Sequence, residues 1–133
     1  MSEVTASYGF PRTRRLLTPG DYRQVFDNVV VKAGTAEIFL LARSASDQEG
    51  PRVGFIISRK NVRRAVARNR IKRVVREHFR HLPADYPKLD IIVMARKGAD
   101  KLPAQSLHDA VQYLFRKLNK RFIGQSAHTS ASQ

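Results

Sequence analysis

The sequence contains no cysteine and has only 11 acidic residues against 25 lysines and arginines. The missing cysteines exclude disulfides, thiolate nucleophiles and zinc sites built on cysteine. No apolar run approaches the ~20 residues that a membrane-spanning helix needs. Residues 1–9 also lack the apolar segment of a secretion signal. We therefore expect a cytoplasmic protein without a membrane partner.

The few acidic residues are scattered, and no pair has a spacing that suggests general acid–base catalysis or a two-metal site. No glycine-rich phosphate loop ending in Gly-Lys-Ser/Thr is present. His78 and His81 are three residues apart on a predicted helix, which would allow a metal pair, but no third ligand is near them. We interpret His78 as a core residue. The sequence thus predicts no catalytic residue, no bound metal and no small-molecule substrate.

What the sequence does contain is positive charge, with a formal net charge of +14 on 133 residues and a hydrophobic content of 42%. That hydrophobic content is enough for one globular domain. A charge of this size and sign favours a polyanion such as nucleic acid as the partner.

The charge is concentrated between Arg59 and Arg80, which hold ten of the lysines and arginines and a single acid, Glu77. We predict a helix over 61–81, capped at its start by the side chain of Asn61. At about 100° per residue its residues separate into two faces. The apolar face consists of Ala67, Ile71, Val74, Val75, His78 and Leu82. The opposite face consists of Asn69, Lys72, Arg73, Arg76 and Arg80. A solvated surface is the simplest interpretation, but the uncompensated repulsion favours a bound polyanion.

The other elements follow from capping and periodicity. Thr18-Pro-Gly-Asp21 predicts a helix start with a capping box, and this helix runs to about Asn28. Its face carries Tyr22 and Phe26, for which core packing is the ordinary interpretation of the residues alone. Strands are predicted over 29–33, 37–43, 52–58 and 89–95, and a last helix over 103–122.

The resulting order, α-β-β-β-α-β-α, predicts a single-domain α+β fold, a two-layer sandwich with a four-stranded sheet. We expect the helices to cover one face, and the other face, flanked by Tyr22 and Phe26, to be partly open. The predicted RNA-binding domain spans 10–123, between a flexible extension at 1–9 and a flexible tail at 124–133.

Together, several motifs resemble the bacterial ribonuclease P protein subunit. The most specific is Ala67-Arg-Asn-Arg-Ile-Lys-Arg73, followed by Arg76-Glu77. Further matches in the family's order are Phe10-Pro-Arg12, Arg15-Leu-Leu-Thr-Pro19, Ala33-Gly-Thr35, Pro51-Arg-Val-Gly54 and Ala95-Arg-Lys-Gly98. The resemblance covers roughly residues 10–122.

The resemblance implies a left-handed βαβ crossover through the basic helix. It also implies that the chain is the accessory subunit of an endoribonuclease whose catalytic part is RNA, with one catalytic RNA expected per chain. That ribonucleoprotein removes the 5′ leader of precursor tRNA with Mg²⁺ at the RNA active site, so the chain itself would bind no cofactor.

The resemblance further implies two binding surfaces. The basic helix and its approach would dock on the catalytic RNA, and the candidate residues are Arg63, Arg64, Arg68, Asn69, Arg70, Lys72, Arg73 and Arg76. A cleft between the first helix and the sheet would hold the single-stranded leader, and the candidates there are Tyr22, Phe26, Phe39, Arg59 and Lys60. On this view the rings of Tyr22 and Phe26 are binding residues rather than plain core.

Two other functions compete with this one. A structural RNA-binding protein, such as a ribosomal one, would have the same composition, and co-purification with whole ribosomes would reveal it. A protein-only nuclease would cleave RNA without an RNA subunit, and the missing carboxylate cluster argues against it.

Overall fold

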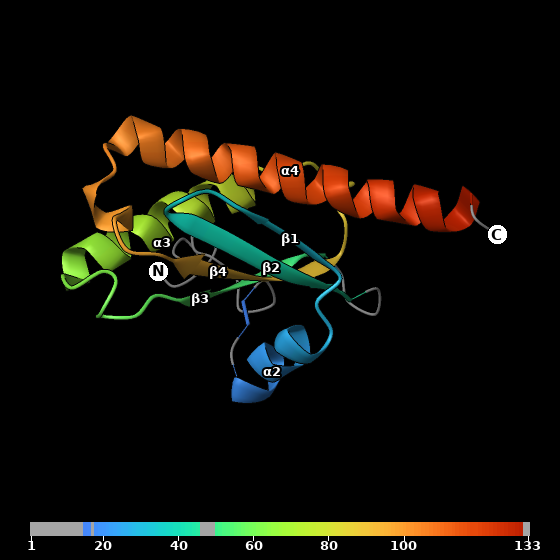
Figure 1. The fold of residues 1–133 in the computed structure, drawn as a ribbon, viewed down its shortest axis with the longest axis horizontal. Coiled ribbons are helices and arrows are strands. Elements are labelled where there is room, and N and C mark those ends of the chain that lie inside the picture. The colour runs from blue at the N-terminus through green and yellow to red at the C-terminus, as the bar shows by residue number, and fades with distance from the viewer. Residues whose placement is uncertain (1–14, 17, 46–49, 132–133) are drawn as a thin grey trace, which may run out of the picture.

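The structure is a computed structural model that describes residues 15–16, 18–45 and 50–131, with side chains up to Gln125. The predicted extension at 1–9, the motif Phe10-Pro-Arg12 and part of the loop after residue 44 lie outside these residues. The elements, in chain order (Figure 1), are α2 (Pro19–Asp27), β1 (Val31–Gly34), β2 (Ile38–Ser44), β3 (Arg52–Ile56), α3 (Ala65–Arg80), β4 (Leu89–Ala95), the 3₁₀ turn η2 (Ala99–Lys101) and α4 (Ala104–Ala131).

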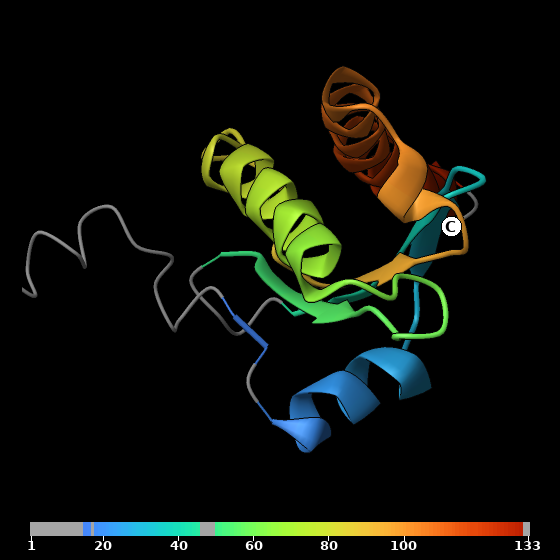
Figure 2. The same ribbon diagram turned by 90° about the vertical axis from the view of Figure 1, so that its left-hand side faces the viewer.

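The four strands form one mixed sheet in the order β1-β2-β4-β3. β1 pairs with β2 and β2 with β4 in antiparallel fashion, whereas β3 and β4 are parallel neighbours. The chain passes from β3 to β4 through α3, and this crossover is left-handed (Figure 2). The predicted α+β fold and element order are confirmed, and every predicted strand end lies within two residues of the observed one.

The sheet has helices on both faces (Figure 2). α3 and α4 cover one face and enclose the main core around Ile71, Leu107 and Leu114. α2 lies on the opposite face, where Val25 and Leu16 pack on Leu41 and Ile92. The sequence analysis expected the helices to cover one face only, and this expectation is wrong, because α2 packs on the opposite face. α2 leaves only part of that face open. The central strand β4 is buried on both sides, as its continuous apolar run predicts.

The start of α2 is as predicted. The Thr18 hydroxyl accepts a hydrogen bond from the Asp21 backbone N–H at 3.1 Å, and the Asp21 carboxylate accepts one from the Thr18 N–H at 3.1 Å. With Pro19 as the first helical residue, this capping box satisfies two backbone donors and fixes the direction in which α2 leaves the sheet edge.

The start of α3 differs from the prediction. The helix begins at Ala65, four residues later than expected, and its N-cap residue is Arg64. Asn61 is not a cap, because its side-chain amide donates to the Ala95 carbonyl at 3.1 Å and so ties the turn after β3 to the end of β4. Val62, next to it, is fully buried. This tertiary anchoring outweighs the local capping preference of asparagine.

The interior faces of the two long helices match the expected patterns in most positions. Ile71, Val74 and Val75 of α3 are buried, and so is Phe79, which the predicted face omitted. His78, in contrast, is only partly buried and lies at the margin of the core. Leu107, Val111, Leu114 and Leu118 of α4 are buried and form the inner stripe of this helix.

α4 is longer than predicted. The helix continues to Ala131, beyond the expected end near Phe122, and projects past the sheet (Figure 1). The segment expected to be a flexible tail from Gly124 is therefore helical up to residue 131. Apolar periodicity could not indicate this, because an overhanging helix has no core to face.

Candidate nucleic-acid interface

The candidate residues of the basic helix fall into two groups by exposure. The side chains of Arg63, Arg64, Asn69 and Arg73 are exposed. Those of Arg68, Arg70, Lys72 and Arg76 are partly buried.

Arg68 and Arg70 use their guanidinium groups within the fold. Arg68 Nη1 donates to the carbonyls of Val62 and Arg63, at 3.0 and 2.9 Å, and holds the turn against the first turn of α3. Arg70 Nη2 donates to the Leu102 carbonyl at 2.7 Å and links α3 to the segment before α4. A guanidinium has five N–H donors, so both groups keep capacity for a ligand, but their first role is to position the helix.

Arg76 lies where α3 meets the edge strand β3. Its guanidinium carbon is 5.2 Å from the ring centroid of Phe55, a cation–π distance. Burial lowers the pKa of Arg76, and the nearby positive charge of Arg15 lowers it further, whereas Tyr22 raises it. Arginine remains charged at neutral pH all the same. Arg76 therefore places a charge between the basic helix and the residues on the α2 side.

Tyr22 packs against the sheet at Gly54, a position without a side chain. Its hydroxyl accepts a hydrogen bond from the Phe55 backbone N–H at 3.1 Å. A Cβ added at Gly54 would lie 2.5 Å from the Tyr22 hydroxyl and 2.7 Å from Cζ. The missing side chain at Gly54 is thus what lets the ring approach the strand.

Phe26 and Phe39 present aromatic surface to solvent on the same side of the sheet. Phe26, on α2, is 45% exposed, although its neighbour Val25 is fully buried. Phe39, on β2, is partly buried beside α2 together with Met94 and Ile56. Register pairs Phe39 with Met94 and Met94 with Ile56, so the three side chains form one row across the sheet.

Positive charge borders this row. Arg59 and Lys60 are exposed in the turn after β3, and Asn61 anchors that turn at Ala95, directly after Met94. The guanidinium carbon of Arg96 lies 4.7 Å from the Phe39 ring centroid. The structure therefore brings Tyr22, Phe26 and Phe39 to one side of the sheet, and it places the turn that carries Arg59 and Lys60 near the end of β4. Arg96 was not among the predicted leader residues, yet it lies beside Phe39. The only indication in the sequence was its position directly after the buried strand β4.

A second row of side chains, which the sequence analysis did not predict, crosses the other end of the α2 side of the sheet. Asp90 is fully buried and pairs with Arg43 (Nη2 to Oδ2, 2.9 Å) and Arg52 (Nε to Oδ1, 2.8 Å). The two arginine side chains remain 21% and 22% exposed. One carboxylate thus fixes two arginines on neighbouring strands and leaves the row with net positive charge. An aspartate within an apolar strand was the only sequence signal.

Metal-binding side chains are not clustered in the described part of the chain. Among these residues, no three His, Asp or Glu side chains come close enough to hold a metal ion. None of the helices in the described ranges is long and apolar enough to cross a membrane.

The fold and its surfaces define a small basic α+β protein with a cationic helix on one side of its sheet and, on the other, the exposed ring of Phe26 and the partly buried ring of Phe39. The family model "Ribonuclease P" matches residues 10–119. The chain therefore belongs to the ribonuclease P protein family, which places it in tRNA processing as part of an endoribonuclease.

Individual members of the family are similar to this chain in sequence or in fold. The "Ribonuclease P protein component" of Chromohalobacter salexigens is 47% identical over 124 residues, which cover 93% of this chain and 96% of the relative. The RNase P protein of Staphylococcus aureus has a similar fold, with a TM-score of 0.70 at 22% identity, over 77% of this chain and 93% of that one. The RNase P protein of Thermotoga maritima has a TM-score of 0.63 at 24% identity, over 80% and 96% of the two chains.

Proposed function

We propose that this chain is the protein subunit of the ribonuclease P ribonucleoprotein. It binds the catalytic RNA through the basic helix and the 5′ leader of precursor tRNA through the α2 side of the sheet, and so assists removal of the leader. The observation that carries the proposal is the separation of surfaces: the exposed arginines lie on α3 and in the turn before it, and the rings of Phe26 and Phe39 lie on the α2 side of the sheet. α3 and α2 lie on opposite faces of the sheet (Figure 2).

The exposed residues of α3 and of the turn before it suit the backbone of a folded RNA. The side chains of Arg63, Arg64 and Arg73 are charged and exposed, and a guanidinium matches phosphate oxygens with two parallel donors. Arg68 and Arg70 contribute mainly by fixing the helix and its approach, which gives the exposed arginines a defined spacing.

The rings of Phe26 and Phe39 suit a single-stranded RNA. Bases of any sequence can stack on Phe26 and Phe39, at about 1–3 kcal/mol per base. Arg59, Lys60 and Arg96 lie at the end of the row and would neutralise the phosphates that follow. Stacking with little hydrogen-bond readout would accept leaders of many sequences, as a tRNA-processing enzyme requires.

In this proposal the chemistry belongs to the RNA. The described residues contain no group of three His, Asp or Glu side chains that could hold a metal ion. The proposal places the Mg²⁺ at the RNA active site. The chain contributes positive charge near crowded phosphates, which lowers the Mg²⁺ concentration that the RNA needs. We expect one chain per catalytic RNA, in the cytoplasm.

Reconstitution tests the proposal. Adding the purified protein to its cognate catalytic RNA should allow precursor-tRNA cleavage at a low Mg²⁺ concentration at which the RNA alone is slow. The protein alone should not cleave. Cleavage by RNA-free protein would support a protein-only nuclease instead, and co-purification with ribosomes rather than with one RNA of a few hundred nucleotides would support a structural binder.

A further inference from the structure

α4 carries a positively charged face that belongs to neither of the surfaces described above. Arg116 and Lys120 are exposed, and Lys117 is partly exposed. Together with Tyr113 and Gly124 they lie within an arc of about 100°, since successive helix residues are ~100° apart. This arc, opposite the buried stripe of α4, is called the outer face of α4 below.

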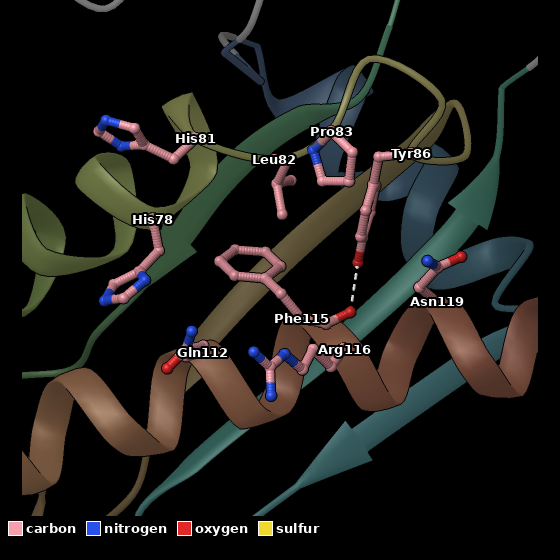
Figure 3. A pocket seen from close by; sticks show the side chains of 9 residues that line it. All are labelled: His78, His81, Leu82, Pro83, Tyr86, Gln112, Phe115, Arg116 and Asn119. Atoms are coloured by element: carbon pink, nitrogen blue, oxygen red, sulfur yellow. Dashed lines mark hydrogen bonds between the residues drawn. The ribbon is translucent and has the colours of Figure 1, made fainter.

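The direction of the outer face is fixed by contacts on the inner side of the helix. The Phe115 carbonyl accepts a hydrogen bond from the Tyr86 hydroxyl at 2.7 Å (Figure 3), and the two rings meet edge to face. Further along α4, Arg121 Nη1 donates to the Lys32 carbonyl of β1 at 2.7 Å. α4 is therefore held against turning about its own axis, and its outer cations keep one direction.

The charge of the outer face is not balanced within the helix. Asp109 is the last acidic residue in the sequence, and its carboxylate accepts a hydrogen bond from Gln105 Nε2 at 2.9 Å. The helix dipole does not account for the cations, because α4 continues to Ala131 and the dipole acts only within the last turn. Uncompensated cations in the middle of a helix favour a polyanion as the partner.

Gly124 lies on the same face, one turn after Lys120. Glycine inside a helix costs about 1 kcal/mol relative to alanine. Packing within the fold does not require it, because nothing lies within 4 Å of a Cβ added at this position. The missing side chain lets a partner approach the helix backbone closely.

The outer face suits double-helical rather than single-stranded RNA. Its one ring, that of Tyr113, already has a cationic neighbour, because Lys117 Nζ donates to the Tyr113 hydroxyl at 2.7 Å and lies 5.2 Å from the ring centroid. Binding of a single strand relies on several rings on which successive bases stack. Double-helical RNA is instead recognised through its phosphates, its 2′-hydroxyls and its shape.

We propose that the outer face of α4 binds the backbone of a double-helical segment of the catalytic RNA. Arg116, Lys117 and Lys120 contact its phosphates, and Gly124 allows the helix to come close. α4 lies on the same face of the sheet as α3 and opposite α2 (Figure 2), which favours the catalytic RNA over the leader as its partner. The proposal rests on the proposed function in taking that RNA as the partner, and it adds a second helix to the interface.

The first test removes two of the charges. Arg116→Gln combined with Lys120→Gln should weaken binding of the catalytic RNA and make the slope against salt concentration about 1.4–1.8 less steep, at ~0.7–0.9 per phosphate contact. Lys32→Gln combined with Lys88→Gln is the matched control, since both lysines are exposed, lie outside α4 and carry the same total charge. Equal changes in slope for the two double variants would overturn the proposal.

The second test adds bulk to the outer face. Gly124→Leu should weaken binding of the catalytic RNA at least threefold without lowering the melting temperature, because leucine favours a helix more than glycine does. Gln125→Leu introduces the same side chain at the next position, which is exposed but lies outside the arc, and it should leave binding unchanged. Equal affinities of the two variants would contradict a close approach at Gly124.

The third test locates the partner. Because the chain contains no cysteine, Lys120→Cys gives a single attachment point for an iron chelate that cleaves nearby RNA through hydroxyl radicals. In the reconstituted enzyme the cuts should fall on both strands of one double-helical segment of the catalytic RNA. Wild type treated with the same reagent gives the background. Cuts confined to single-stranded RNA, cuts in the precursor tRNA instead, or no cuts above background would each overturn the proposal.

Stimulation of precursor-tRNA cleavage at low Mg²⁺ is measured on the same samples. Stimulated cleavage without cuts from position 120 would overturn this inference only. Cuts in the catalytic RNA without stimulation would overturn the proposed function only.

Discussion

At the scale of single residues, the aromatic surface depends on a glycine. The ring of Tyr22 occupies the space where a side chain at position 54 would be, and its hydroxyl is bonded to the backbone of the same strand. Tyr22 therefore serves the fold first, and Phe26 and Phe39 are the rings with surface to spare for a base.

Gly54→Ala should destabilise the protein. The new Cβ would lie 2.5 Å from the Tyr22 hydroxyl and 2.9 Å from Leu16 Cβ, so α2 must shift. We expect a loss of about 1–3 kcal/mol in the free energy of unfolding, measured in urea. Gly124→Ala is the control, since nothing lies within 4 Å of its added Cβ. It should be neutral or stabilising by up to ~1 kcal/mol. Equal stability of the Gly54 variant and wild type would show that the Tyr22 contact is not tight.

Phe26→Ala should weaken the binding of precursor tRNA to the reconstituted enzyme by about 1–3 kcal/mol, the value of one stacked base. The loss should disappear for substrates whose leader is too short to reach the ring. Phe26 is 45% exposed, so Phe26→Ala should lower the melting temperature less than the truncation of a fully buried phenylalanine would.

Phe26→Leu controls for packing, since it keeps an apolar side chain and removes the ring. An unchanged affinity for long-leader substrates, with either variant well folded, would remove Phe26 from the leader surface.

At the scale of the elements, the residues of the basic helix have two roles. Some hold the helix in the fold, and others face outward. Arg68→Ala loses two hydrogen bonds to carbonyls and should lower the free energy of unfolding by about 1–2 kcal/mol. Arg73→Ala removes an exposed charge and should weaken catalytic-RNA binding with little change in stability. Chemical unfolding and filter binding of both variants check this, and similar stability losses for the two would contradict the division.

The contact between α3 and α4 should make stability depend on pH. His78 Nε2 lies 3.0 Å from His108 Nδ1. Burial lowers the pKa of His78, as do His108 and His81, while Glu77 raises it. The folded state therefore binds fewer protons than the unfolded state, so stability should fall as the pH drops below about 6.5, the unfolded value.

Unfolding in urea at pH 7.5 and 5.5 measures this difference. In His108→Gln the neighbouring imidazole is gone, and the loss of stability at the lower pH should be smaller. A larger loss in the variant than in wild type would rule out repulsion between the two rings.

Sequence patterns predicted the elements where local chemistry determines them. The capping box indicated the start of α2, and the apolar run of residues 89–95 indicated a strand. They failed where a partner distant in sequence decides. Asn61 bonds to Ala95 instead of capping α3, and Asp90 pairs with arginines 47 and 38 residues away. The division of the basic helix likewise required the carbonyls of Val62 and Leu102, whose positions no periodicity reveals.

At the scale of the whole molecule, the net charge of +14 should dominate affinity for RNA. If about six phosphates are contacted, the logarithm of the binding constant should fall against the logarithm of salt concentration with a slope of about −4 to −5. Binding assays of the protein with its catalytic RNA from low to moderate salt measure the slope. A slope near zero would contradict an electrostatic interface.

The order of the strands has a consequence for how the chain is made. In the described part of the chain, the sheet partner of β3 is β4, and β4 also joins β3 to the β1–β2 pair. Because β4 follows α3 in the sequence, a nascent chain that has not reached Leu89 holds an incomplete sheet with the basic helix already synthesised. Closure must wait for the insertion of a central strand between two earlier ones, a non-local step of the kind that slows folding. During synthesis on the ribosome, the most cationic segment therefore emerges among RNA before it has a sheet to pack against.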